Sequence, residues 1–202
     1  MSKHITQADF KGLGQVATHC DLEKLEIALN EAYNFDLCEV FGNFSASVGL
    51  VVDEVLSHGG AGHDHHDEAN PDWDLAVLGT AFEVNGVTIN TLGLKTAIVY
   101  YAYARYLVLN GYNDTPNGQV SKENPFSIPK PFKEVQQFAD KYRNMAKSVA
   151  ETAKLFICEN KDSFPSLAKM PCPTSLCGDI DGLCNSNTTG YGIRGKNVSK
   201  YE

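Results

Sequence analysis

The stretch that most constrains the fold is Leu92–Gly111, LGLKTAIVYYAYARYLVLNG. Its apolar side chains are spread over every side of a 3.6-residue helix, and such a helix is buried in a core, against other subunits or in a membrane. A membrane span would enclose Lys95, Arg105 and four tyrosines, which disfavours that alternative. The stretch therefore predicts a buried central helix, ended by Asn110 and Gly111 as a left-handed cap.

Arg105 lies inside this apolar helix. A buried guanidinium has to be paired with an acid, and Asp36, Glu39 and Glu83 are the candidates. This pattern favours a structural ion pair over a catalytic arginine.

The sequence before the central helix predicts two helices and a hairpin. Asp21 is a good N-cap for a helix that ends at Gly42. A shorter helix is expected over Ser45–Leu56. DWDLAVLG, from Asp72, predicts one or two turns of helix with Trp73, Val77 and Leu78 turned inward. An Asn-Gly pair between β-favouring residues then predicts a hairpin over Thr80–Asn90.

A long helix is predicted from Phe132 to about Asn160. Its large apolar residues recur at intervals of three and four, which is typical of an amphipathic helix with one buried stripe. We expect that stripe to pack in the core with the central helix. It comprises Val135, Phe138, Tyr142, Met145, Val149, Ala153 and Phe156.

Together these patterns predict a mainly α fold: a helical bundle with a long central helix, a small β-hairpin and an extended C-terminal arm. The helical domain is expected over residues 1–167, with loop insertions at 57–72 and 112–129. The loop at 112–129 contains one short extended piece near Gly118–Lys122. Residues 168–202 have no helical period and are expected to form the arm.

Charge is distributed unevenly along the chain. Residues 1–90 contain 15 acidic and 3 basic residues, whereas residues 91–202 contain 10 acidic and 14 basic residues. Two surfaces of opposite sign are a basis for head-to-tail self-association, although an uneven solvated surface is an equal alternative. A net charge of −8 disfavours a protein that wraps nucleic acid, because phosphate binding needs clustered Lys and Arg.

Two groups of residues could bind a metal. His63, His65 and His66 lie beside carboxylates in the segment GHDHHDEAN, but their flanking glycines favour a solvated loop. Cys172, Cys177 and Cys184 lack the paired spacing of a structural zinc site. MSKHITQADF has no apolar signal segment, so we expect folding in a cytoplasm, where all six cysteines remain free thiols. No cofactor is expected, and the alternative function is a small metal-dependent enzyme that uses the three histidines.

The order of segments resembles the head-to-tail connector proteins of tailed bacteriophages, and most closely the neck-ring proteins of crAss-like phages. The most specific stretches are GLK with YYAYARYL in the central helix and the TP-x-G-x-V-x-K segment from Thr115 to Lys122. The likeness also includes FDLCEVFG at Phe35–Gly42 and extends over about Asp21–Leu167. The histidine loop and the cysteine-rich tail lie outside it.

The resemblance implies a virion structural protein of the neck, assembled in the host cytoplasm and without catalytic residues. Such proteins form homo-oligomeric rings, commonly of twelve copies, that join the portal protein to other neck or tail rings. Double-stranded DNA passes through their lumen without sequence-specific binding, and no membrane is involved. We expect partner contacts in the loop after the central helix and in the arm. These residues are Thr115, Pro116, Val120, Lys122, Phe126, Tyr191, Ile193 and Arg194.

Overall fold

The computed structural model describes residues 4–13, 21–57, 72–115, 118–121 and 131–172, with only the backbone at 12, 72 and 112–121. These residues belong to one unit, Met1–Cys172. The first elements are η1 (Gln7–Leu13), α1 (Leu22–Glu31), η2 (Ala32–Asp36), α2 (Leu37–Phe41), η3 (Gly42–Phe44), α3 (Ser45–Ser57) and α4 (Asp72–Leu78). They are followed by β1 (Thr80–Val84), β2 (Val87–Thr91), α5 (Gly93–Asn110), β3 (Tyr112–Thr115), β4 (Gly118–Ser121), α6 (Phe132–Glu159), η4 (Lys161–Ser163) and η5 (Pro165–Leu167).

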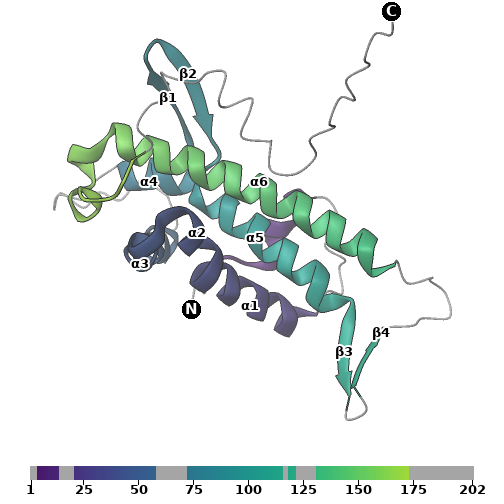
Figure 1. Cartoon of the computed structure of the whole chain (residues 1–202). Helices are drawn as coiled ribbons and strands as arrows, with labels where there is room; N and C mark the ends of the chain where they lie inside the picture. The colour runs from purple at the N-terminus through teal and green to yellow at the C-terminus, as the bar shows by residue number, and fades with distance from the viewer. Residues whose placement is uncertain (1–3, 14–20, 58–71, 116–117, 122–130, 173–202) are drawn as a thin grey trace, which may run out of the picture. The chain divides into compact units, whose positions relative to one another are not determined.

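The predicted central helix is α5, which lies between α1 on one side and α6 on the other (Figure 1). Its buried residues include Ile98, Tyr103 and Ala104, on different sides of the helix. The expected left-handed cap is wrong, because Gly111 has a right-handed φ of −71°. The chain continues directly from Gly111 into β3, so α5 ends with a tight turn in which the Gly111 N–H donates to the Val108 carbonyl.

The first helix is interrupted by a π-helical turn that the sequence did not predict. Asp21 caps α1 as expected, because its carboxylate accepts a hydrogen bond from the Lys24 N–H at 3.2 Å. The π turn η2 then precedes α2, which ends at Gly42 with a positive φ of 55°. The predicted helix over Ser45–Leu56 is confirmed as α3, which buries Val48, Val52 and Val55.

The predicted hairpin is confirmed as the antiparallel pair β1–β2, joined by Asn85 and Gly86, both with positive φ. Two glycines allow the backbone segments that flank this hairpin to pack closely against each other. Gly79 precedes it and Gly93 follows it, and a Cβ atom on Gly93 would collide with the backbone of Val77 and Gly79. Only glycine therefore fits at Gly93, where α5 begins against the end of α4.

The predicted face of α6 is partly wrong. Phe138 and Met145 are 47% and 37% exposed, and the residues that follow them, Ala139 and Ala146, are buried instead. Ala146 and Ala150 contact the core together with Ala153 and Phe156, which belong to the predicted stripe, and with Ile157. Small side chains allow α6 to approach the large tyrosines of α5 closely, which places the bulkier residues at the edge of the contact.

The fold class is confirmed: the protein is mainly α-helical, a bundle with a long central helix and a small hairpin. Three details differ from expectation. The segment 112–129 begins with a second hairpin, β3–β4, instead of a loop. Leu78 is 43% exposed, and Ala76 faces the core in its place. Residues 168–172 belong to the helical unit, because Met170 is buried in its core.

Candidate partner-binding surfaces

The first candidate surface is the β3–β4 hairpin, which extends beyond the C-terminal end of α5 (Figure 1). Thr115, the last residue of β3, is paired with Gly118, and Val120 of β4 is paired with Asn113. The structure thus places two of the predicted contact residues on one two-stranded ribbon. Exposed ribbon edges are backbone hydrogen-bonding surfaces that another chain can use.

The other predicted contact residues lie outside the described residues. They are Pro116, Lys122, Phe126, Tyr191, Ile193 and Arg194, and the extended arm beyond Cys172 lies there with them. So do the metal candidates His63, His65, His66, Cys177 and Cys184. Within the described ranges, no three His, Cys, Asp or Glu side chains are grouped as a metal site would require.

Arg105 forms the most strongly connected polar group in the described structure. It makes a two-pronged contact with Asp36, from Nε to Oδ2 at 2.7 Å and from Nη2 to Oδ1 at 2.9 Å. Its Nη1 donates to Glu31 Oε2 at 2.8 Å. The hydrogen bonds that Arg105 donates to Asp36 are the main reason why the pKa of Arg105 is raised. The predicted pairing with Asp36 is confirmed, whereas Glu39 and Glu83 are not its partners.

The π turn is what brings the partners of Arg105 together. Glu31 is the last residue of α1, and Asp36 is the last residue of the π turn that follows. The π turn therefore separates the two acids, and both of them contact Arg105 of α5. Phe35, in the same turn, lies with its ring 5.6 Å from the Arg105 guanidinium and is still 61% exposed. π turns often occur at functional sites, and an exposed aromatic ring supported by an arginine is typical of a protein interface. The sequence motif FDLCEVFG contained Phe35, but no pattern in it indicated a π turn.

Tyr101 lies next to this group and is fully buried. Its hydroxyl has no hydrogen-bond partner in the structure. Burial, and then the nearby charges of Glu39 and Asp36, raise the pKa of Tyr101 above its ordinary value. The hydroxyl therefore stays protonated near neutral pH, and we do not assign it a role as an acid or a base.

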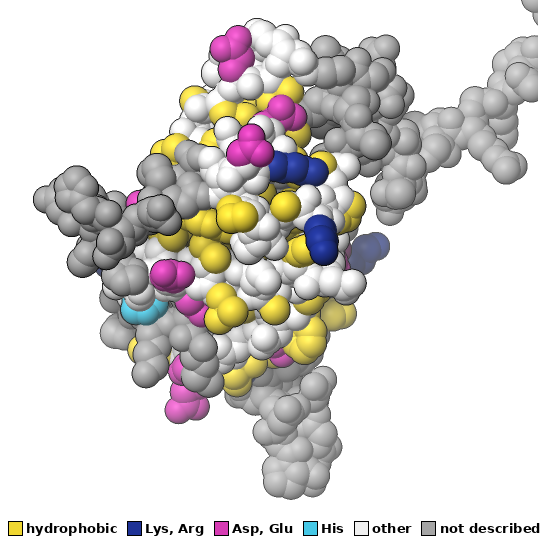
Figure 2. Space-filling view, turned by 90° about the vertical axis from the view of Figure 1, so that its left-hand side faces the viewer, with side chains coloured by type: hydrophobic (Ala, Val, Ile, Leu, Met, Phe, Trp, Pro, Cys, Tyr) yellow, Lys and Arg dark blue, Asp and Glu magenta, His cyan; other side chains and the backbone are white. Residues whose placement is uncertain are grey.

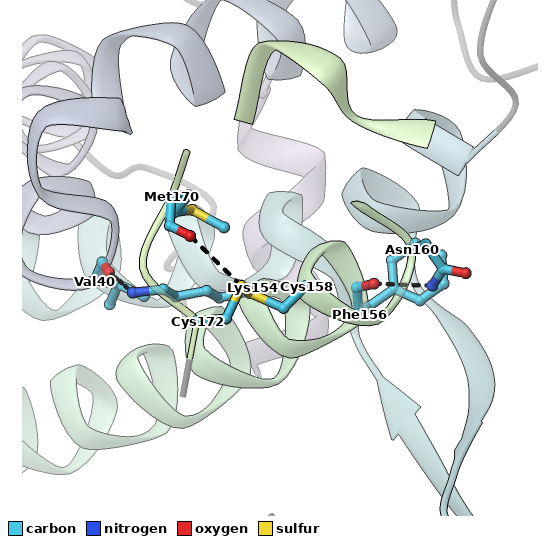
Figure 3. The surroundings of a disulfide bond; sticks show 7 residues. All are labelled: Val40, Lys154, Phe156, Cys158, Asn160, Met170 and Cys172. Atoms are coloured by element: carbon cyan, nitrogen blue, oxygen red, sulfur yellow. Dashed lines mark hydrogen bonds between the residues drawn. A yellow bond between two sulfur atoms is a disulfide. The ribbon is translucent and has the colours of Figure 1, made fainter. Parts of the chain in front are cut away.

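A disulfide between Cys158 and Cys172 fastens the chain after α6 to the last turn of that helix (Figure 3). This overturns the expectation that all six cysteines are free, and it removes Cys172 from the zinc candidates. Within the described residues, Cys38 is a free thiol and is exposed. Close to the disulfide, Lys154 Nζ donates to the Val40 carbonyl at 2.8 Å and so joins α6 to the end of α2. Spacing could not predict the pair, because nothing in the sequence distinguishes these two cysteines from the other four.

A further apolar surface lies where α4 meets the start of α5. Leu75, Leu78 and Leu92 are 40%, 43% and 54% exposed. The end of the bundle that carries α4 faces the viewer in Figure 2, where hydrophobic side chains lie over much of the surface. Single exposed leucines are ordinary, but several at one end of a bundle are typical of a contact surface.

A membrane span was disfavoured for the central helix. By length and composition alone, one helical run among the described residues, Leu22–Ser57, could cross a membrane, and core helices of soluble proteins and signal sequences pass the same test. In this structure the run is divided by the left-handed Gly42, and it contributes Leu25, Leu37 and Val52 to the core.

Comparisons with known proteins give one match. No curated protein and no solved structure is similar to this chain. A model of a family of unknown function, DUF6712, matches residues 66–175. That range includes both hairpins, α5, α6 and both cysteines of the disulfide, and it is more than half of the chain. The chain therefore belongs to the DUF6712 family, whose function is unknown.

Proposed function

We propose that this protein is a structural subunit of the phage neck: one copy of a homo-oligomeric connector ring that joins the portal protein to the next neck or tail ring. The observation that carries the proposal is the resemblance of its two most specific stretches to connector proteins. In the fold, GLK and YYAYARYL belong to α5, and the TP-x-G-x-V-x-K segment includes the end of β3 at Thr115 and the strand β4. The stretch in α5 forms part of the subunit core, and the stretch in the β3–β4 hairpin extends beyond the end of α5.

The packing of the subunit supports an assembly role. A ring subunit must present two different, complementary surfaces to its neighbours. Here α5 is covered by α1 on one side and by α6 on the other, and both covering helices have an exposed outer side. The hairpin at one end of α5 and the leucines at the other are available for contacts along the neck.

The overall charge agrees with a DNA channel. The chain has a net charge of −8, so a lumen lined by its acidic parts would repel phosphates and let double-stranded DNA slide without being held. The proposal includes no enzymatic activity, cofactor or membrane. The protein would assemble in the host cytoplasm and remain in the virion.

Negative-stain electron microscopy of the purified protein at high concentration tests the proposal. The expected result is closed rings with a central channel, commonly of twelve copies. The same sample diluted into a buffer of high ionic strength is the control for aggregation, because salt weakens charged contacts between subunits, whereas non-specific apolar aggregates persist. Monomers alone at every concentration, or open filaments without closure, would contradict the proposal.

A further inference from the structure

The helices on the two sides of α5 differ in the charge of their outer surfaces. α1 and α6 both pack on α5, from opposite sides (Figure 1). The segment of α1, η2 and α2 contains five acidic residues and one basic residue. The first part of α6, Phe132–Lys147, contains four basic and two acidic residues. Glu31 and Asp36 are paired with Arg105, so the exposed charges of the first segment are mainly those of Glu23, Glu26 and Glu39. The first part of α6 has a net charge of +2, from its four basic and two acidic residues, so these two segments on opposite sides of α5 have opposite charge.

The acidic face comprises five exposed side chains of α1, η2 and α2: Glu23, Glu26, Ile27, Phe35 and Glu39. Within the described residues, none of its three glutamates takes part in an ion pair. Ile27 and Phe35 are 49% and 61% exposed and supply apolar area among the charges. The Arg105 guanidinium lies over the Phe35 ring at 5.6 Å, a cation–π contact that favours this position of the exposed side chain.

The basic face comprises Lys133, Lys141, Met145 and Lys147 of α6, all exposed. These lysines too form no ion pair with any described residue, unlike Arg143, which is paired with Asp140. By the helical repeat, Lys133 and Lys141 are turned away from the buried alanines that contact the core, and Lys147 lies at the edge of that contact. Met145, 37% exposed, is a flexible apolar side chain that can adapt to an aromatic ring.

We propose that the acidic face of one copy binds the basic face of the next. This inference rests on the proposed ring and identifies the two surfaces that close it. Like charges oppose each other if two acidic faces or two basic faces meet, so a two-fold symmetric dimer through either face is disfavoured. Faces of opposite sign on opposite sides of a subunit join head to tail, and such contacts close into rings.

Two charge-reversal variants test the pairing. The acidic-face variant is Glu23→Lys, Glu26→Lys and Glu39→Lys, and the basic-face variant is Lys133→Glu, Lys141→Glu and Lys147→Glu. Each variant alone presents two faces of the same sign, so the oligomer seen by size-exclusion chromatography with light scattering should be lost. When the two are mixed in equal amounts, every contact again joins opposite charges, and the oligomer should return as alternating copies.

A matched control reverses three acids that lie outside both faces: Asp74→Lys, Glu83→Lys and Asp162→Lys. It changes the net charge as much as the acidic-face variant does, and it should assemble like the unchanged protein. Circular dichroism of each variant checks that the helices are intact. Raising the salt from about 0.1 to 1 M shortens the screening length from about 10 to 3 Å and should weaken assembly of the unchanged protein.

The outcomes separate this inference from the proposed function. If the unchanged protein forms rings and either folded variant forms them alone, the assignment of the faces is wrong and the ring stands. If both variants lose the ring but their mixture does not regain it, the pairing is likewise wrong. If the unchanged protein never forms a ring, the proposed function fails, and this inference fails with it.

Discussion

The two sides of α5 are packed by different chemistry. On the α1 side, the apolar contacts of Leu25, Ala28 and Leu29 are supplemented by polar ones. Arg105 donates hydrogen bonds to Asp36 and Glu31, and Lys24 Nζ donates to the Leu109 carbonyl at 3.0 Å. On the α6 side, the buried contacts of α6 are mainly alanines, and the Tyr103 and Tyr142 rings meet edge to face at 4.7 Å. Apolar contacts tolerate small shifts of one helix along another, whereas hydrogen bonds between charged groups require one relative position of the two helices. We infer that the contact with α6 contributes mainly apolar burial to the free energy of folding. The contact with α1 sets the position of α1 along α5.

The largest expected effect comes from breaking the polar side. Arg105→Met leaves the Asp36 carboxylate, 3% exposed, without its partner, and removing one member of a buried pair costs about 3–5 kcal/mol. Urea unfolding measures the loss. Arg143→Met is the matched control, because its 3.4 Å pair with Asp140 is exposed and should contribute at most about 1 kcal/mol. Equal losses in the two variants would contradict the proposed difference between the sides.

The disulfide gives the next effect, on the α6 side. Cys158 and Cys172 are 14 residues apart, and closing a loop of that size in the unfolded chain is worth about 3 kcal/mol. The double variant Cys158→Ser and Cys172→Ser should lower the free energy of unfolding by about that amount, as measured by urea unfolding without reductant. Cys38→Ser, at an exposed free thiol, should leave stability unchanged. A reductant should have no effect on the double variant, and any large effect there would mean that another bond is being broken.

A smaller effect tests the alanine contact. Ala146 is fully buried, so Ala146→Leu forces extra methyl groups between α6 and α5 and should cost about 1–3 kcal/mol. Ser148→Leu, on the exposed part of the same helix, is the control, with an expected change of at most about 0.5 kcal/mol. Thermal unfolding of both compares them. If Ala146→Leu is tolerated as well as Ser148→Leu, α6 does not pack as closely as described.

The smallest effect concerns Tyr101. Because its hydroxyl is buried without a partner, Tyr101→Phe should leave stability near neutral pH unchanged or raise it by about 1 kcal/mol. The raised pKa of Tyr101 means that the folded state favours the neutral phenol. Folding therefore loses stability as the pH rises above about 10, where the tyrosines of the unfolded chain ionise. Tyr101→Phe should lose less stability over that range than the unchanged protein, and an identical pH profile would contradict the assigned burial.

The sequence predicted the elements with strong local patterns. Asp21, the Asn85–Gly86 turn and the apolar run of α5 each act through their own neighbours in the chain, so their structure follows from residue type. Asp36 was one of three acids predicted as partners of Arg105, because a buried guanidinium has to be paired, whereas its second partner, Glu31, was not among them.

The features that were missed depend on contacts between distant parts of the chain. The buried face of α6 is set by the tyrosines opposite it, so alanines are buried and Phe138 is exposed, although Phe138 is the more apolar. The π turn depends on how α1 and α2 meet α5. Of the candidate contact residues, Thr115 and Val120 are placed on one hairpin, and their role as contacts stays a prediction.

The measurement that tests the central claim most directly is the mass of the purified protein by light scattering, at several concentrations and two salt levels. A subunit has a mass of 22.1 kDa. The account predicts one large closed oligomer, or a monomer that converts to that single species as its concentration rises. A monomer under every condition, or a continuous series of growing sizes, would contradict it.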